Sequence, residues 1–186
     1  MIQGMAKKGL HGLGKGIPTK EHRRALAKEI IHASDRSVAI LLTNYLDECL
    51  RVALWGILPN RDDNTPKDRL FSDFGVLGTL SAKISMAHAM MLIGDVTYKN
   101  LETIRKIRNV FAHSAHPLTF RTPEIRAACK SLVRLPAVYR MKEIAFRSSR
   151  DKFVATVYET SHTVVLQSTF ETYTRTNRSG WMVPMP

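Results

Sequence analysis

Arg108, Asn109 and His113 are a group of chemically versatile side chains that falls within a strong helix pattern, with the spacing R-N-x-x-x-H. A histidine titrates near neutral pH and can serve as a general base or acid. An arginine can grip a phosphate through two donors and stabilise charge that develops on it, while an asparagine can orient either neighbour. These residue types suit metal-independent RNA cleavage. The alternative is a structural role, in which Arg108 and Asn109 pair with an acid and with helix ends.

The stretch that carries these residues, 95–116, has the strongest helical pattern of the chain, with apolar residues at Leu101, Ile104, Ile107 and Phe111. At about 100° per residue, Arg108 falls inside this apolar arc. A guanidinium cannot lose its proton there, so it needs an acidic partner, a bound anion or a subunit interface. Asp47, on an earlier predicted helix, is the candidate acidic partner, and Lys83 either snorkels or adds positive charge near Arg108.

Periodicity and capping residues predict further helices on both sides of this stretch, with Thr19, Ser34 and Thr79 as N-caps. We expect them over 20–33, 35–58, 66–71, 80–92, 123–135 and 153–170, with Gly94 as the stop of the fourth and a capping-box pattern at 148–151 before the last. The last segment is rich in β-branched residues, which would also allow strands, but the surrounding helices favour a helix. The sequence therefore predicts an all-α bundle of six or seven helices over 19–172. A flexible basic tail is expected at 1–18 and an irregular tail at 173–186.

The formal net charge of the 186 residues is +12. The excess is concentrated in the interval 121–152, where nine Lys or Arg residues stand against three acids. Such a field favours polyanions, so RNA or DNA is an expected partner, although charge alone carries no sequence specificity. The two cysteines, Cys49 and Cys129, fit buried free thiols in a reducing compartment. With no signal-peptide pattern and no uninterrupted apolar span, we expect a cytoplasmic protein that does not enter a membrane.

No cofactor or metal is expected. His113 and His116 have an H-x-x-H spacing, but no third ligand with suitable spacing lies near them. We expect a tight connection at 74–78. Its glycines at 75 and 78 match neither of the common phosphate-binding glycine patterns.

Several ordered motifs carry a family resemblance. R-N-x-x-x-H resembles the signature of the HEPN superfamily, small helical proteins that include metal-independent RNases. The set SDR at 34–36, YLDE at 45–48, FGxLGTLSAKI at 74–84 and IRKIRNxFAH at 104–113 is similar to the mannitol operon repressor family, a HEPN-like group. The resemblance covers about 19–150. It implies a HEPN-like homodimer in which two copies of Arg108 and His113 meet. Candidate supporting polar residues are Asp35, Arg36, Asp47 and Lys83.

From this resemblance we expect a transcription-regulatory protein. The sequence shows no helix-turn-helix with a short glycine turn and a polar recognition helix. Regulation would then act through a protein partner or through charge-driven contact with nucleic acid. The alternative is a metal-independent endoribonuclease that uses Arg108, Asn109 and His113, and of the two the non-enzymatic function is favoured.

Overall fold

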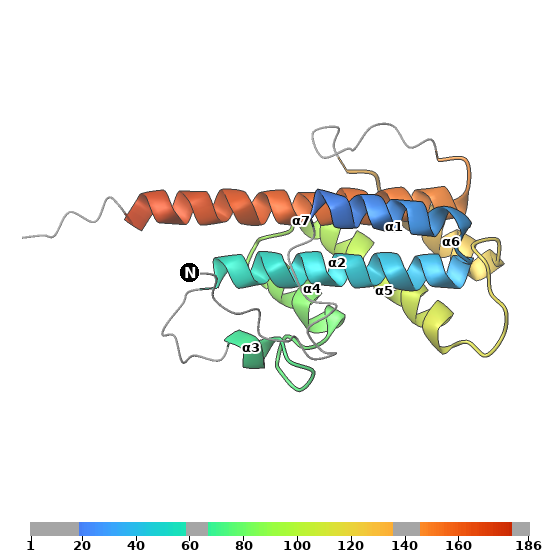
Figure 1. Cartoon of the computed structure of the whole chain (residues 1–186), viewed down its shortest axis with the longest axis horizontal. Coiled ribbons are helices and arrows are strands. Elements are labelled where there is room, and N and C mark those ends of the chain that lie inside the picture. The colour runs from blue at the N-terminus through green and yellow to red at the C-terminus, as the bar shows by residue number, and fades with distance from the viewer. Residues whose placement is uncertain (1–18, 59–66, 136–145, 180–186) are drawn as a thin grey trace, which may run out of the picture.

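The computed structural model describes residues 19–58, 67–135 and 146–179, with backbone only for 67–68 and 170–179. These residues form an all-α bundle with no strand among them, as the sequence predicts (Figure 1). Six longer helices and one four-residue helix follow in the order α1 (Lys20–His32), α2 (Asp35–Ile57), α3 (Lys67–Leu70), α4 (Leu80–Ala89), α5 (Asp95–His113), α6 (Pro123–Ser131) and α7 (Ser149–Ser179).

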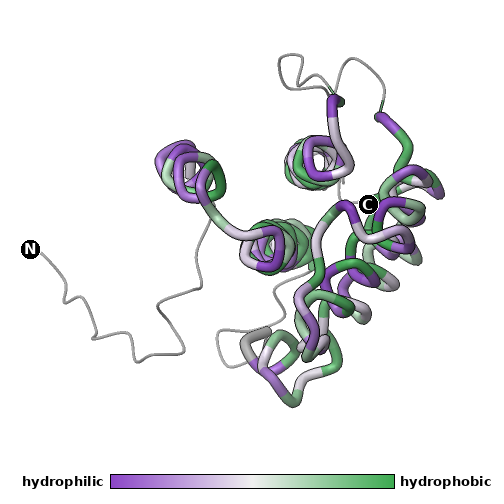
Figure 2. Tube along the Cα trace, turned by 90° about the vertical axis from the view of Figure 1, so that its right-hand side faces the viewer, coloured by the Kyte–Doolittle hydropathy of each residue, from purple (hydrophilic) through white to green (hydrophobic). Residues whose placement is uncertain are grey.

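Helices α2 and α7 form the centre of the bundle and run side by side in the same direction (Figure 1). Helix α5 packs against both, and α4 and α6 complete that side. Helix α1 stands at the edge and packs chiefly against α2. The apolar sides of the helices face one another (Figure 2). This packing removes one apolar stripe of each helix from water. Fully buried members of this core include Leu46, Leu101 and Phe153.

The predicted starts of α1, α2 and α4 are confirmed by capping hydrogen bonds. The side chains of Thr19, Ser34 and Thr79 accept hydrogen bonds from the backbone N–H groups of His22, Ser37 and Ala82. Ser148 accepts from the N–H of Asp151 at 3.1 Å and so caps α7. Each cap satisfies a donor that the first turn of a helix leaves without a partner.

The connection between α3 and α4 is a tight turn, as expected. Gly75 is required there because a Cβ atom would lie 2.1 Å from the carbonyl oxygen of Arg69. The turn is closed by the hydrogen bond from the N–H of Leu77 to the carbonyl of Leu70, at 2.7 Å. It leaves Phe74 fully exposed.

Helix α4 ends earlier than the predicted stop at Gly94. Its last residue is Ala89, and Met91 follows in the left-handed region with φ of 55°. The N–H groups of Met91 and Leu92 donate to the carbonyls of His88 and Ala87. This is a Schellman motif in which methionine occupies a position usually held by glycine. Gly94 instead precedes α5 as its N-cap residue.

Helix α6 also ends before the predicted position of Leu135. Its last residue is Ser131, and the chain then extends past Val133. The buried amide of Asn100 on α5 accepts from the N–H of Val133 at 2.9 Å and donates to its carbonyl at 2.7 Å. A distant side chain thus replaces the helical hydrogen bonds of this residue, which local sequence could not indicate.

The segment with high β propensity is helical, as expected, and α7 continues beyond the predicted end. Residues 173–179, expected to be irregular, belong to the helix. Neither glycine nor proline occurs in the sequence between Ser149 and Gly180, so nothing in the chain interrupts the helix earlier. The predicted basic tail at 1–18 and the tail after Ser179 lie outside the described residues.

Both cysteines are free and buried, as predicted. Within the described part of the chain, none of the helices combines the length and apolarity needed to cross a membrane.

Candidate functional site

A polar hollow lies where α2, the start of α4 and α5 meet, and Arg108 lines it. Its volume is about 490 Å³. Arg108 is half-buried, as its place in the apolar arc predicts, and its Nη1 donates to Asn109 Oδ1 at 3.2 Å. We call this the Arg108 hollow; it is lined by Thr43, Asn44, Asp47, Gly78, Thr79, Leu80, Ser81, Arg105, Arg108 and Asn109.

Asp47 is in this hollow but does not pair with Arg108, so the predicted ion pair is wrong. Both carboxylate oxygens of Asp47 accept from Lys83 Nζ at 2.7 Å. The side chain of Lys83 is only 4% exposed, whereas Asp47 is 34% exposed. A buried ammonium requires a compensating carboxylate. This explains why Asp47 pairs with Lys83 and not with Arg108. Among the described residues, Arg108 forms no ion pair.

His113 does not join Arg108 in this hollow. It is the last residue of α5 and is exposed. Five residues advance about 500° around a helix, so the two side chains point about 140° apart. Within one chain, the structure brings Arg108 and Asn109 together and places the histidine elsewhere. His116 is exposed as well, and no group of three metal-ligating side chains exists in the described ranges.

Asp35 and Arg36, expected to support the Arg108 site, instead join helix ends at the opposite end of α2 from α3. Arg36 Nη2 donates to the carbonyls of Ser114 and His116 at 2.9 and 3.0 Å. Asp35 accepts from the N–H of Phe120 at 2.8 Å. These bonds fix the chain that follows α5 against the start of α2.

The other oxygen of Asp35 accepts from Arg150 Nη1 at 2.8 Å. Arg150 Nη2 also donates to the carbonyls of Ile30 and Ala33, at 2.7 and 2.9 Å. One guanidinium therefore satisfies orphan carbonyls at the end of α1 and ties them to α2 and α7.

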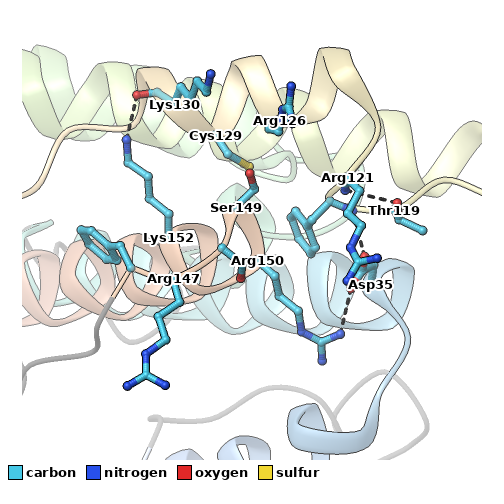
Figure 3. Close-up of a pocket in the computed structure, with 13 residues that line it drawn as sticks. Asp35, Thr119, Arg121, Arg126, Cys129, Lys130, Arg147, Ser149, Arg150 and Lys152 are labelled. Atoms are coloured by element: carbon cyan, nitrogen blue, oxygen red, sulfur yellow. Dashed lines mark hydrogen bonds and ion pairs between the residues drawn. The ribbon is translucent and has the colours of Figure 1, made fainter.

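A second and larger hollow, of about 890 Å³, lies next to this junction. Figure 3 shows its side chains coming from α6 on one side, from the start of α7 on the other and from the turn before α6. We call it the basic hollow; it is lined by Asp35, Thr119, Phe120, Arg121, Arg126, Cys129, Lys130, Phe146, Arg147, Ser148, Ser149, Arg150 and Lys152.

Most cations of the basic hollow have no acid beside them among the described residues. Of the described residues that line it, Asp35 is the one with a carboxylate, and this group accepts a hydrogen bond from Arg150. Lys152 Nζ donates to the carbonyl of Lys130 at 2.7 Å, which leaves its charge uncompensated. Four more cations are exposed and form no ion pair among the described residues: Arg121, Arg126, Lys130 and Arg147. This arrangement attracts anions with several negative charges.

Cys129 lies at the floor of the basic hollow but is not a reactive thiol. It is fully buried, and burial raises its pKa to about 11, against a smaller lowering by the charge of Lys152. The neutral thiol is a weak nucleophile, so the surrounding cations do not make this a cysteine-based catalytic site.

The basic hollow was not predicted as a site, although its signal was present in the sequence. The excess of Lys and Arg over 121–152 was noted, and six of those cations line the hollow. A local sequence pattern could not show that the end of α6 and the start of α7 face each other.

No family model, no curated protein and no solved structure matches this chain. The resemblance to the mannitol operon repressor family therefore rests on the sequence motifs quoted above.

Proposed function

We propose that this protein is a transcription-regulatory protein of the mannitol-repressor type that contacts nucleic acid through phosphates rather than through a helix-turn-helix. The basic hollow carries the proposal. It gathers six cationic side chains from three segments around one concave surface, and the single carboxylate among its described lining residues already has a partner. The expectation of a role in transcription regulation comes from the motif resemblance.

Contacts of this kind position a protein on the phosphate backbone and read no bases directly. Each phosphate that is neutralised releases counterions, so the affinity falls steeply with salt. Sequence preference would then come from a protein partner or from the shape of the nucleic acid. The predicted homodimer would double the basic surface.

The test is a salt titration of binding to labelled DNA and RNA, followed by fluorescence anisotropy. The variant Arg126→Ala/Lys130→Ala should lower the affinity and reduce the slope of log K against log salt by about 2. The matched control is Lys99→Ala/Lys106→Ala, which removes the same charge from exposed positions on α5 that do not line the hollow. Absence of binding at about 50 mM salt, or equal effects of both variants, would contradict the proposal.

Regulation is tested separately in cells. A transcript that rises when the gene is deleted should fall again with the wild-type protein and with the α5 control variant. It should stay high with Arg126→Ala/Lys130→Ala if both proteins are present at equal levels.

A second candidate is the metal-independent RNase, favoured by one observation. The guanidinium of Arg108 is half-buried yet bonds only to a neutral amide, so an anion or a second subunit would complete its environment. In a dimer that brings His113 of one chain to Arg108 of the other, the imidazole could move the 2′-hydroxyl proton. Arg108 would stabilise the charged phosphorane.

The RNase is tested by incubating pure protein with labelled RNA in EDTA. Loss of cleavage in both Arg108→Ala and His113→Ala, with unchanged circular dichroism, supports the enzyme. His116→Ala is the control, because His116 is a nearby exposed histidine outside the motif. Intact RNA in the presence of wild-type protein argues against this candidate.

A further inference from the structure

The lining of the basic hollow is divided into an apolar floor and a cationic rim. Phe120 and Cys129 are buried at the floor, and the thiol is neutral. Phe146 also lines the hollow and is half-buried, with the guanidinium carbon of Arg134 4.3 Å from its ring centroid. The exposed cations are placed around this floor, with Arg126 and Lys130 on α6.

This division fits a ligand with a flat apolar part and negative charges at its edge. The volume of about 890 Å³ lies within the range of pockets that enclose a small ligand, so the hollow can take a base and the adjoining backbone. In a duplex, base faces are stacked on each other and cannot reach such a floor. In a single strand they are free to stack on an aromatic ring while the phosphates meet cations.

We propose that the basic hollow binds single-stranded nucleic acid, with a base on the floor beside Phe146 and the neighbouring phosphates at the rim. This rests on the proposed function and specifies its ligand: the protein prefers single strands to duplexes. Arg126 and Lys130 come from α6 and Arg121 from the turn before it, whereas Arg147 comes from the chain just before α7 (Figure 3).

Asp35 and Arg150 act here as positioning residues. Asp35 binds the N–H of Phe120 and thereby holds the turn before α6, while Arg150 fixes the first turn of α7. This pair fixes the distance between the two walls of the hollow. The hollow is therefore formed before a ligand binds.

The experiment compares a labelled oligouridylate of about twelve nucleotides with a duplex of the same length, by anisotropy at about 50 mM salt. We expect the single strand to bind about tenfold more tightly. Phe146→Ala should lower single-strand affinity about tenfold and change duplex affinity less than twofold. Phe74→Ala, which removes an exposed ring that does not line the hollow, should change neither.

The outcomes separate this inference from the proposed function. Equal or tighter duplex binding, or no effect of Phe146→Ala, overturns the single-strand preference but leaves phosphate binding intact. If neither probe binds at low salt, both proposals are wrong. Should Phe146→Ala lose its helical circular dichroism, Phe146→Leu removes the aromatic face with less change in packing. The wild-type ratio of single-strand to duplex affinity decides the question without any variant.

Discussion

The basic hollow and the Arg108 hollow both contain arginines, but the two hollows differ in which positive charges are paired with a carboxylate. In the basic hollow, the single carboxylate among the described lining residues belongs to a structural junction, and the rim cations are exposed and form no ion pair within the described ranges. In the Arg108 hollow, the carboxylate of Asp47 is taken by buried Lys83, and a half-buried guanidinium is left with a neutral neighbour.

The difference lies in how each carboxylate is occupied. Lys83 is 4% exposed and holds Asp47 because an unpaired buried charge would be costly, whereas Arg150, which is 29% exposed, holds Asp35 as part of a junction between helices. The cations that remain are the ones available for ligands. In the basic hollow these cations are exposed and numerous, which suits a polyanion. In the Arg108 hollow a single partly enclosed guanidinium suits a compact anion or a second subunit.

The largest effect is expected from Asp47→Ala. It leaves the ammonium of Lys83, which is 4% exposed, without a partner. The free energy of unfolding should fall by about 3 kcal/mol, measured by urea denaturation. In the double variant Asp47→Ala/Lys83→Met the loss should be smaller, because no charge remains buried. A drop below about 1 kcal/mol in the single variant would show that this pair does not determine the charge distribution of the Arg108 hollow.

Arg150→Ala should have the next largest effect. It removes three hydrogen bonds that join α1, α2 and α7 and leaves Asp35 without its cation. We expect a loss of about 2 kcal/mol in thermal or urea unfolding. Arg126→Ala, on the rim of the same hollow, is the control and should change stability by less than about 0.5 kcal/mol. Equal losses in the two variants would contradict the distinction between structural and available cations.

A third prediction concerns pH and the floor of the basic hollow. Burial raises the pKa of Cys129 to about 11, whereas the unfolded thiol titrates lower. Between these values the unfolded state loses a proton that the folded state keeps, so stability falls as pH rises. The contribution is about 1 kcal/mol by pH 10. Cys129→Ala should show a smaller decrease between pH 8 and pH 10 than the wild type. An identical decrease in the variant and the wild type would show that groups other than Cys129 cause the loss of stability.

Consistently, a thiol reagent at about pH 8 should leave Cys129 unmodified in the folded protein. Fast modification without unfolding would show that the surrounding cations outweigh burial.

The smallest effect on stability is expected from Arg108→Ala. Because this guanidinium has one hydrogen bond and no ion pair among the described residues, its removal should change the free energy of unfolding by less than about 0.5 kcal/mol. Chemical denaturation is the measurement. A loss above about 2 kcal/mol would mean that Arg108 is structural, and the contrast between the two hollows would no longer hold.

Much of the fold could be predicted because its signals are local. Caps such as Thr19 and Ser34 lie beside the residues they serve, and apolar periodicity identifies the buried faces of α2 and α5. The partial burial of Arg108 followed from the same periodicity. Even the tight turn at Gly75 was indicated by residue type.

Several of the errors share a different cause, because they depend on residues far along the chain. The early end of α6 is set by Asn100, and the partner of Asp47 is set by the depth at which Lys83 lies. Asp35 and Arg36 appeared to belong with Arg108 because they are charged and lie near an apolar stripe. In the structure Arg36 donates to backbone carbonyls after α5, and Asp35 accepts from a backbone N–H and from a distant guanidinium.

The amino-acid sequence alone determined the helical class of this protein, where most of its helices begin, and its surplus of positive charge. Those properties follow from short-range hydrogen bonds, from periodic apolar positions and from composition. The tertiary structure alone decided which charges are compensated and which remain available. It placed the basic residues of 121–130 and 147–152 on two facing walls. Burial and distance, which depend on the whole bundle, fix the energy of each charge.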